Sequence, residues 1–103
     1  SESNNSDPAR LRIAIQDSTD DTEAVRTMVK ALEKAGYRNV YVGEASREPL
    51  PVSHIVAQKG DDGSAAALRA ALGVGEVLVE STGNLASDVT IKLGQDWRQQ
   101  QRN

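Results

Sequence analysis

Residues 11–43, LRIAIQDSTDDTEAVRTMVKALEKAGYRNVYVG, decide the fold. At their start Leu11, Ile13 and Ile15 alternate with Arg, Ala and Gln, the period of two expected of a strand with one face on a core. At their end Asn39-Val-Tyr-Val-Gly43 is short and rich in β-forming residues. A helical pattern separates these two segments, so the stretch predicts a β-α-β unit.

The predicted helix has a start signal and a stop signal. Several side chains of Asp17–Glu23 can accept hydrogen bonds from free N–H groups at a helix start, and Asp20 and Glu23 have capping-box spacing. Apolar residues then recur at helical spacing, at Val25, Met28, Val29 and Leu32. Gly36 follows, and we expect it to close the helix in a left-handed conformation.

The same order of elements repeats in the second half of the chain. His54–Gln58 predicts a strand, Ser64–Leu72 an Ala-rich helix, and Glu76–Glu80 another strand. We therefore expect an α/β (α+β) fold: a two-layer sandwich, ferredoxin-like in its β-α-β-β-α-β order, with two helices on one face of a mixed sheet. The alternating run Asp88–Leu93 allows a fifth strand.

Composition excludes several classes of function. The sequence has 12 Lys and Arg residues and 15 Asp and Glu residues, and the basic residues form no cluster. We therefore expect no nucleic-acid partner. Cysteine is absent, which excludes disulfides and thiolate chemistry. No apolar run approaches the roughly 20 residues that cross a bilayer, so we expect no membrane insertion by this segment.

The ends of the chain are polar. Ser1–Pro8 has no apolar residue to bury, so residues 1–9 predict a linker or an added overhang, while residues 98–103 predict a polar tail. The folded domain is expected over residues 10–97.

Several stretches share their order and spacing with one known family. Ser87-Asp-Val-Thr-Ile-Lys-Leu-Gly-Gln-Asp-Trp97 follows a D-V-T-x-x-L-G-x-D pattern. Ile13–Thr19 runs from an aliphatic strand into a turn, Ala35-Gly-Tyr37 ends a helix, and Lys59-Gly-Asp61 precedes the helix of Ala66–Leu72. In this order they resemble the LytR C-terminal domain, which follows the catalytic domain in many LytR-CpsA-Psr cell-envelope proteins. The chain departs from that pattern at Gln16-Asp17, where the family more often has Asn-Gly.

This resemblance implies an extracytoplasmic accessory domain of a larger, membrane-anchored protein. In such proteins the phosphotransfer that attaches glycopolymers to peptidoglycan belongs to the separate catalytic domain, so this chain is expected to have no catalytic residues, metal or cofactor. Its expected partner is peptidoglycan or a wall glycopolymer, or a neighbouring catalytic domain that it positions. The family is also labelled a transcriptional attenuator, a role that this acidic chain gives no physical reason to expect.

Two polar loops provide the candidate ligand contacts. One follows the first strand and the other follows the third, and we expect these two strands to run parallel, which would bring their loops to one edge. The predicted binding residues are Gln16, Asp17, Thr19, Lys59 and Asp61. Their mixture of donors and acceptors suits sugar hydroxyls or peptide amides better than polyphosphate.

Alternative interpretations accompany these candidates. The acidic residues 17–23 favour helix capping over a cation site, because the D-x-D-x-D-G spacing of a calcium loop is absent. His54 has no identified catalytic partner and is expected to point out of a strand. Trp97 either stacks on a sugar ring or, as we favour, packs over the core.

Two rival functions belong to other classes. A protein–protein or oligomerisation module would use the uncovered sheet face or an edge strand. A hydrolase or phosphotransferase ranks third, because the sequence shows no catalytic cluster.

Overall fold

The computed structural model describes residues 8–58, 60–80 and 87–101. Within them the chain forms, in order, β1 Arg12–Asp17, α1 Thr22–Lys34, β2 Asn39–Val42, β3 His54–Ala57, α2 Asp62–Leu72, β4 Glu76–Val79, β5 Val89–Leu93 and α3 Gln95–Gln101. The predicted α/β class is confirmed, and the possible fifth strand is present as β5.

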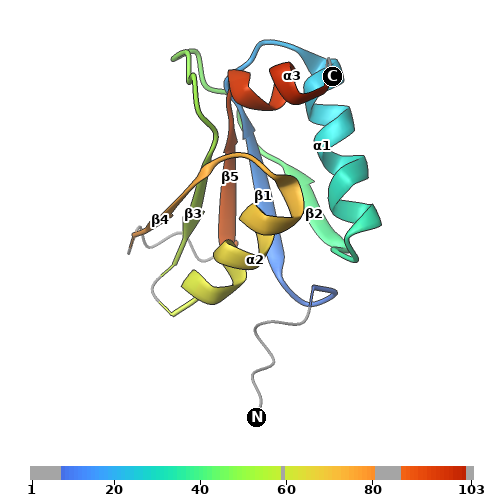
Figure 1. The fold of residues 1–103 in the computed structure, drawn as a ribbon, viewed down its shortest axis with the longest axis vertical. Helices are drawn as coiled ribbons and strands as arrows, with labels where there is room; N and C mark the ends of the chain where they lie inside the picture. The colour runs from blue at the N-terminus through green and yellow to red at the C-terminus, as the bar shows by residue number, and fades with distance from the viewer. Residues whose placement is uncertain (1–7, 59, 81–86, 102–103) are drawn as a thin grey trace.

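The strands form one mixed sheet in the order β2-β1-β5-β3-β4 (Figure 1). β1 runs parallel to β2 and to β5, whereas β3 runs parallel to β4 and antiparallel to β5. The expectation that the first and third strands run parallel is therefore wrong. A period-two pattern shows which face of a strand is buried but not which strand pairs with it, and β5 separates the two β-α-β units.

The hydrophobic core lies between the sheet and the two long helices. Right-handed crossovers from β1 to β2 and from β3 to β4 place α1 and α2 on the same face of the sheet, as predicted (Figure 1). The largest fully buried side chains of this core are Ile13, Ile15, Met28, Leu32, Ile55, Leu68, Ile91 and Leu93. Ala14 and Val56 are also buried but lie outside this cluster, because alternate strand residues point to the opposite face.

Both ends of α1 have clear caps. Asp21, rather than the predicted Asp20, is the N-cap, and its carboxylate accepts a hydrogen bond from the Glu23 backbone N–H at 3.0 Å. Asp20 instead adopts a left-handed conformation with φ 56°, so it turns the chain into the helix. At the other end Gly36 has φ 99°, which confirms the predicted left-handed closure.

The end of β5 meets the segment that enters β3 at a close backbone crossing. A Cβ atom on Gly94 would lie 2.5 Å from the Leu50 carbonyl oxygen and 2.9 Å from the Ser53 nitrogen. The Ser53 hydroxyl accepts from the Gly94 N–H at 2.8 Å and donates to Asp96 Oδ1 at 2.6 Å, while the Ser53 N–H donates to the same oxygen at 3.0 Å. These four residues, here named the Gly94 junction, fix two distant parts of the chain to each other.

The helix α3 was not predicted, and it extends into the segment expected to be a polar tail. Trp97 anchors it: the indole is only 3% exposed, and its Nε1 donates to the Ala24 carbonyl at 3.2 Å and to Thr27 Oγ1 at 3.0 Å. Arg98 Nε also donates to the Asp21 carboxylate at 3.0 Å. Trp97 therefore packs over the core, as we favoured, and its ring is not available to stack on a sugar.

An ion pair joins the starts of two central strands. Arg12 Nη2 lies 3.0 Å from Asp88 Oδ1, and the Arg12 backbone N–H donates to Asp88 Oδ2 at 2.9 Å. The side-chain hydrogen bond from Arg12 lowers the pKa of Asp88, against the smaller opposing effect of burial. The ionised form of Asp88 therefore favours the folded state.

The Gly36→Val substitution tests the cap of α1. A β-branched residue resists the left-handed conformation at this position, so the free energy of unfolding should fall by about 1 to 2 kcal/mol. Chemical denaturation monitored by circular dichroism measures this change. An unchanged midpoint would contradict the assigned conformation.

The Gly94→Ala substitution tests the Gly94 junction. The added methyl group meets backbone atoms that cannot move aside independently, so we expect a loss of about 3 kcal/mol. Gly63→Ala is the matched control, because nothing lies within 4 Å of its Cβ position and α2 gains a better helix former. Equal denaturation midpoints for the two variants would contradict the close approach of Gly94 to the Leu50 and Ser53 backbone.

The Asp88→Asn substitution tests the ion pair through its pH dependence. Because the folded pKa of Asp88 lies below its ordinary value of 3.8, the pair stabilises the fold fully above that value, and the contribution is lost as the pH falls through the lowered pKa. The wild-type protein should therefore be more stable than the variant near pH 7, and the difference should shrink towards about pH 2. Urea denaturation across this range measures it, and a difference independent of pH would contradict the assignment.

Candidate functional site

A polar crevice lies at the carboxyl ends of the parallel strands β1 and β2. Its volume is about 560 Å³, and it is lined by Asp17, Ser18, Thr19, Asp20, Ala45, Ser46, Arg47, Pro49 and Gln95. Ligands of α/β folds commonly bind outside the carboxyl ends of parallel strands, where loops and helix starts converge. We name this hollow the strand-end crevice.

The wall of the strand-end crevice is a rigid turn after β1. Asp17 Oδ1 accepts hydrogen bonds from the Thr19 N–H at 2.8 Å and from Thr19 Oγ1 at 2.5 Å. The Ser18 N–H donates to the Leu93 carbonyl at 3.1 Å, which ties the turn to β5. Ser18 and Thr19 are both buried, so the turn holds its shape without a ligand.

The opposite wall is the loop that leaves β2. The Ser46 N–H donates to the Asp17 backbone carbonyl at 2.7 Å, and this bond places Arg47 beside the turn. Sequence reasoning missed Ser46, Arg47 and Gln95, because they belong to a loop and a short helix that carry no periodic pattern. The one feature that could have indicated them is that they are polar residues outside the predicted strands and helices, where binding residues are common.

The chemistry of the strand-end crevice is that of hydrogen bonding. Its carboxylates are Asp17 and Asp20, and Arg47 is its cation. The described residues contain no group of three or more His, Asp or Glu side chains placed to hold a metal ion. The lining can therefore bind hydroxyl and amide groups from both the donor and the acceptor side.

The predicted binding residues do not all come together. Asp17 and Thr19 line the strand-end crevice, whereas Gln16 lies next to Lys92 of β5 on the sheet face that α1 and α2 leave uncovered. Asp61 lies at the opposite end of the sheet, because β3 runs antiparallel to β5 and therefore to β1. Lys59 lies outside the described residues.

Asp61 has a different electrostatic setting from the crevice residues. Burial raises its pKa most, the Asp88 carboxylate raises it further, and Arg12 partly opposes them. Asp61 precedes α2 but makes no side-chain capping bond. It therefore belongs with the ion pair at the start of β1 and β5 rather than with the crevice.

The uncovered sheet face carries a row of side chains across all five strands. The register places Tyr41, Ala14, Thr90, Val56 and Leu78 side by side in this row. Tyr41 is 43% exposed, and it stands on the edge strand β2. His54 lies on the same face, between Lys92 and Glu76 in the register.

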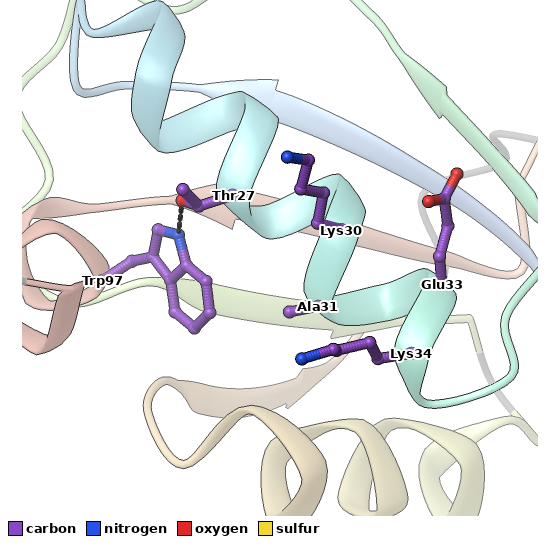
Figure 2. Close-up of a pocket in the computed structure, with 6 residues that line it drawn as sticks. All are labelled: Thr27, Lys30, Ala31, Glu33, Lys34 and Trp97. Carbon is purple, nitrogen blue, oxygen red and sulfur yellow. Dashed lines mark hydrogen bonds between the residues drawn. The ribbon is translucent and has the colours of Figure 1, made fainter.

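A second hollow lies on the helical side of the molecule, between α1 and α3. Its volume is about 630 Å³, and it is lined by Thr27, Lys30, Ala31, Glu33, Lys34 and Trp97 (Figure 2). Figure 2 shows α2 running along the far side of this hollow, with Lys34 extending into the space before it. We name it the interhelix hollow.

Comparison with solved structures shows the fold. The soluble domain of a conserved hypothetical secreted protein from Mycobacterium marinum, an Rv2700 ortholog, is similar with a TM-score of 0.71 and 14% identity, over 88% of this chain and 63% of that chain. The chain thus spans less than two thirds of that domain. The C-terminal domain of RV0431, solved in solution, is similar with a TM-score of 0.57 and 16% identity, over 82% of this chain and 72% of that chain.

Comparison with families and curated proteins gives the classification. No curated protein matches the chain. The family described as LytR cell envelope-related transcriptional attenuator matches residues 10–97, which include the five described strands, α1, α2 and the first three residues of α3. The resemblance stated from the sequence is thereby confirmed, and the chain belongs to the LytR_C family.

Proposed function

We propose that this LytR_C domain is a non-catalytic accessory domain of a cell-envelope protein, and that it binds wall polymer in the strand-end crevice. The family match supports the role in the cell envelope. The observation that carries the binding role is the fixed turn of Asp17 and Thr19, which faces Ser46 and Arg47 across a hollow of about 560 Å³.

The shape and chemistry of the strand-end crevice suit part of a glycan or a stem peptide. A volume of this size is within the range of small-molecule sites, and it accepts one or two sugar rings or a few peptide units. Carboxylate, hydroxyl, amide and guanidinium groups pair with neutral sugar hydroxyls and peptide amides. Two carboxylates against one guanidinium disfavour a strongly anionic ligand such as polyphosphate.

A catalytic role lacks support in the described residues. His54 lies on the uncovered sheet face, beside Lys92 and Glu76 in the register, and it does not line the strand-end crevice. Asp61, a carboxylate whose pKa is raised, lies at the other end of the sheet from the crevice. The proposal therefore assigns any chemistry to another domain of the parent protein.

The proposed location is outside the cytoplasm. The M. marinum neighbour is described as a secreted protein, and the family is described as cell-envelope related. None of the helices in the described parts of the chain is long and apolar enough to cross a bilayer. On this proposal the domain reaches wall polymer from an anchor elsewhere in the parent protein.

A protein–protein module is the second candidate, and the uncovered sheet face favours it. Tyr41 at the edge of this face is 43% exposed, whereas Ala14 and Val56 at its centre are already buried within the domain. A neighbouring envelope domain or a second copy of this chain would bury this surface. Analytical ultracentrifugation of the purified domain shows whether it self-associates, which distinguishes a second copy of this chain from a different partner protein.

An amide-shift titration of the labelled domain with a disaccharide muropeptide tests the proposed function. We expect shifts at residues 17–20 and 46–49, because these two segments form the walls of the strand-end crevice. Arg47→Ala should weaken binding by about three- to tenfold, which is the effect of losing one net hydrogen bond. Arg38→Ala is the control, because this exposed arginine lies beyond the far end of α1.

Two results would contradict this proposal. Shifts that cluster on Tyr41, Thr90 and Leu78 would move the site to the uncovered sheet face. An absence of shifts at millimolar muropeptide would favour the protein–protein function instead.

A further inference from the structure

The interhelix hollow has no part in the proposed binding of wall polymer, and its chemistry differs from that of the strand-end crevice. Its lining residues come from α1 and α3, and Figure 2 shows α2 running past it below Lys34. Trp97 closes the inner end: its indole is almost fully buried, and both Ala24 and Thr27 accept its N–H. The inner wall is therefore rigid.

Two cations flank the interhelix hollow. Lys30 and Lys34 lie one helical turn apart on α1 and both line the hollow, and in Figure 2 Lys34 extends from α1 into the space between Trp97 and α2. Glu33 points away from them in the same view. Among the described residues no ion pair involves either lysine, whereas Arg12, Arg26 and Arg98 each pair with a carboxylate. A local positive rim thus stands on a chain with net charge −3.

The surface around this rim is composed of small side chains. Ala31 lies between the two lysines in the lining of the hollow. On α2 the exposed residues include Ala66, Ala67, Ala70 and Ala71. Arg69 donates to the Gly75 carbonyl just before the edge strand β4, so the helical period places Ala67 and Ala71 on the opposite flank of α2. Small residues on both sides allow another backbone to approach closely.

We propose that the interhelix hollow docks an acidic amphipathic helix of a partner protein. In this arrangement the apolar face of the helix lies on Ala31 and on the alanines of α2. Two carboxylates one turn apart on its flank face Lys30 and Lys34, whose own spacing along α1 is the same.

A small free anion fits the interhelix hollow less well than a helix does. Both lysines are exposed, and the buried polar group of the lining, the Trp97 N–H, is already bonded within the chain. A small anion would therefore meet only solvated, mobile ammonium groups, which bind weakly. A helix adds apolar contact along α1 and α2 to the same charge pairing.

Trp97 provides a built-in reporter for the test, because it is the only tryptophan of the chain. The probe is a synthetic, acetylated peptide of about 18 residues, long enough to form a helix, with leucines and alanines on one face and glutamates at i and i+4 on the flank. We expect a saturable change in Trp97 emission and amide shifts at residues 27–34 and 67–71. The same peptide with glutamines in place of the glutamates should bind about tenfold more weakly.

Matched variants locate the charge pairing. Lys30→Glu with Lys34→Glu should weaken binding by at least about tenfold, because attraction becomes repulsion. Arg26→Glu with Arg38→Glu changes the net charge by the same amount at exposed positions that do not line the hollow, and should alter binding by less than about twofold. Thermal melting of each variant verifies that it is folded.

Three outcomes would overturn the proposal. The first is equal binding of the glutamate and glutamine peptides, and the second is an equal effect of the two double variants. The third is a shift of the same resonances by anionic phospholipid vesicles but not by the peptide, which would point to a membrane surface. None of these outcomes bears on muropeptide binding, so failure here leaves the proposed function intact.

Discussion

The close crossing of Gly94 over the Leu50 carbonyl is the constraint on which the rest of the structure depends. It fixes the end of the central strand β5 against the segment that enters β3, and Ser53 and Asp96 close it with three hydrogen bonds. Because α3 begins immediately after Gly94, the same crossing sets the position of Trp97 over α1. The L-G-x-D part of the family pattern thus has a structural role in this chain.

The place of β5 decides how polar groups are distributed over the surface. As β5 is parallel to β1 and antiparallel to β3, the two β-α-β units point in opposite directions. The turn after β1 and the turn before α2 therefore lie at opposite ends of the sheet. The strand-end crevice belongs to the first unit and is completed by the loop after β2 and by Gln95 of α3.

The two hollows differ in the charged residues that line them. The strand-end crevice has two carboxylates and one guanidinium, which favour neutral, hydrogen-bonding ligands. The interhelix hollow has two lysines without ion pairs in the described residues, next to small apolar side chains. An accessory domain with both features would hold wall polymer at one surface and a protein segment at another.

The sequence by itself determined the strands, the two long helices, their buried faces and the glycine that closes α1. The period of two in Leu11–Ile15, the helical spacing of Met28 and Leu32, and the glycine at position 36 all predicted what the structure shows, because each reports interactions within a few residues. The family pattern at residues 87–97 predicted the membership. Only the tertiary structure decided that β5 lies between β1 and β3, which separates Asp17 from Asp61, and that Arg47 and Gln95 complete the crevice. Strand pairing and loop placement depend on contacts between residues far apart in the chain, and no local period encodes them.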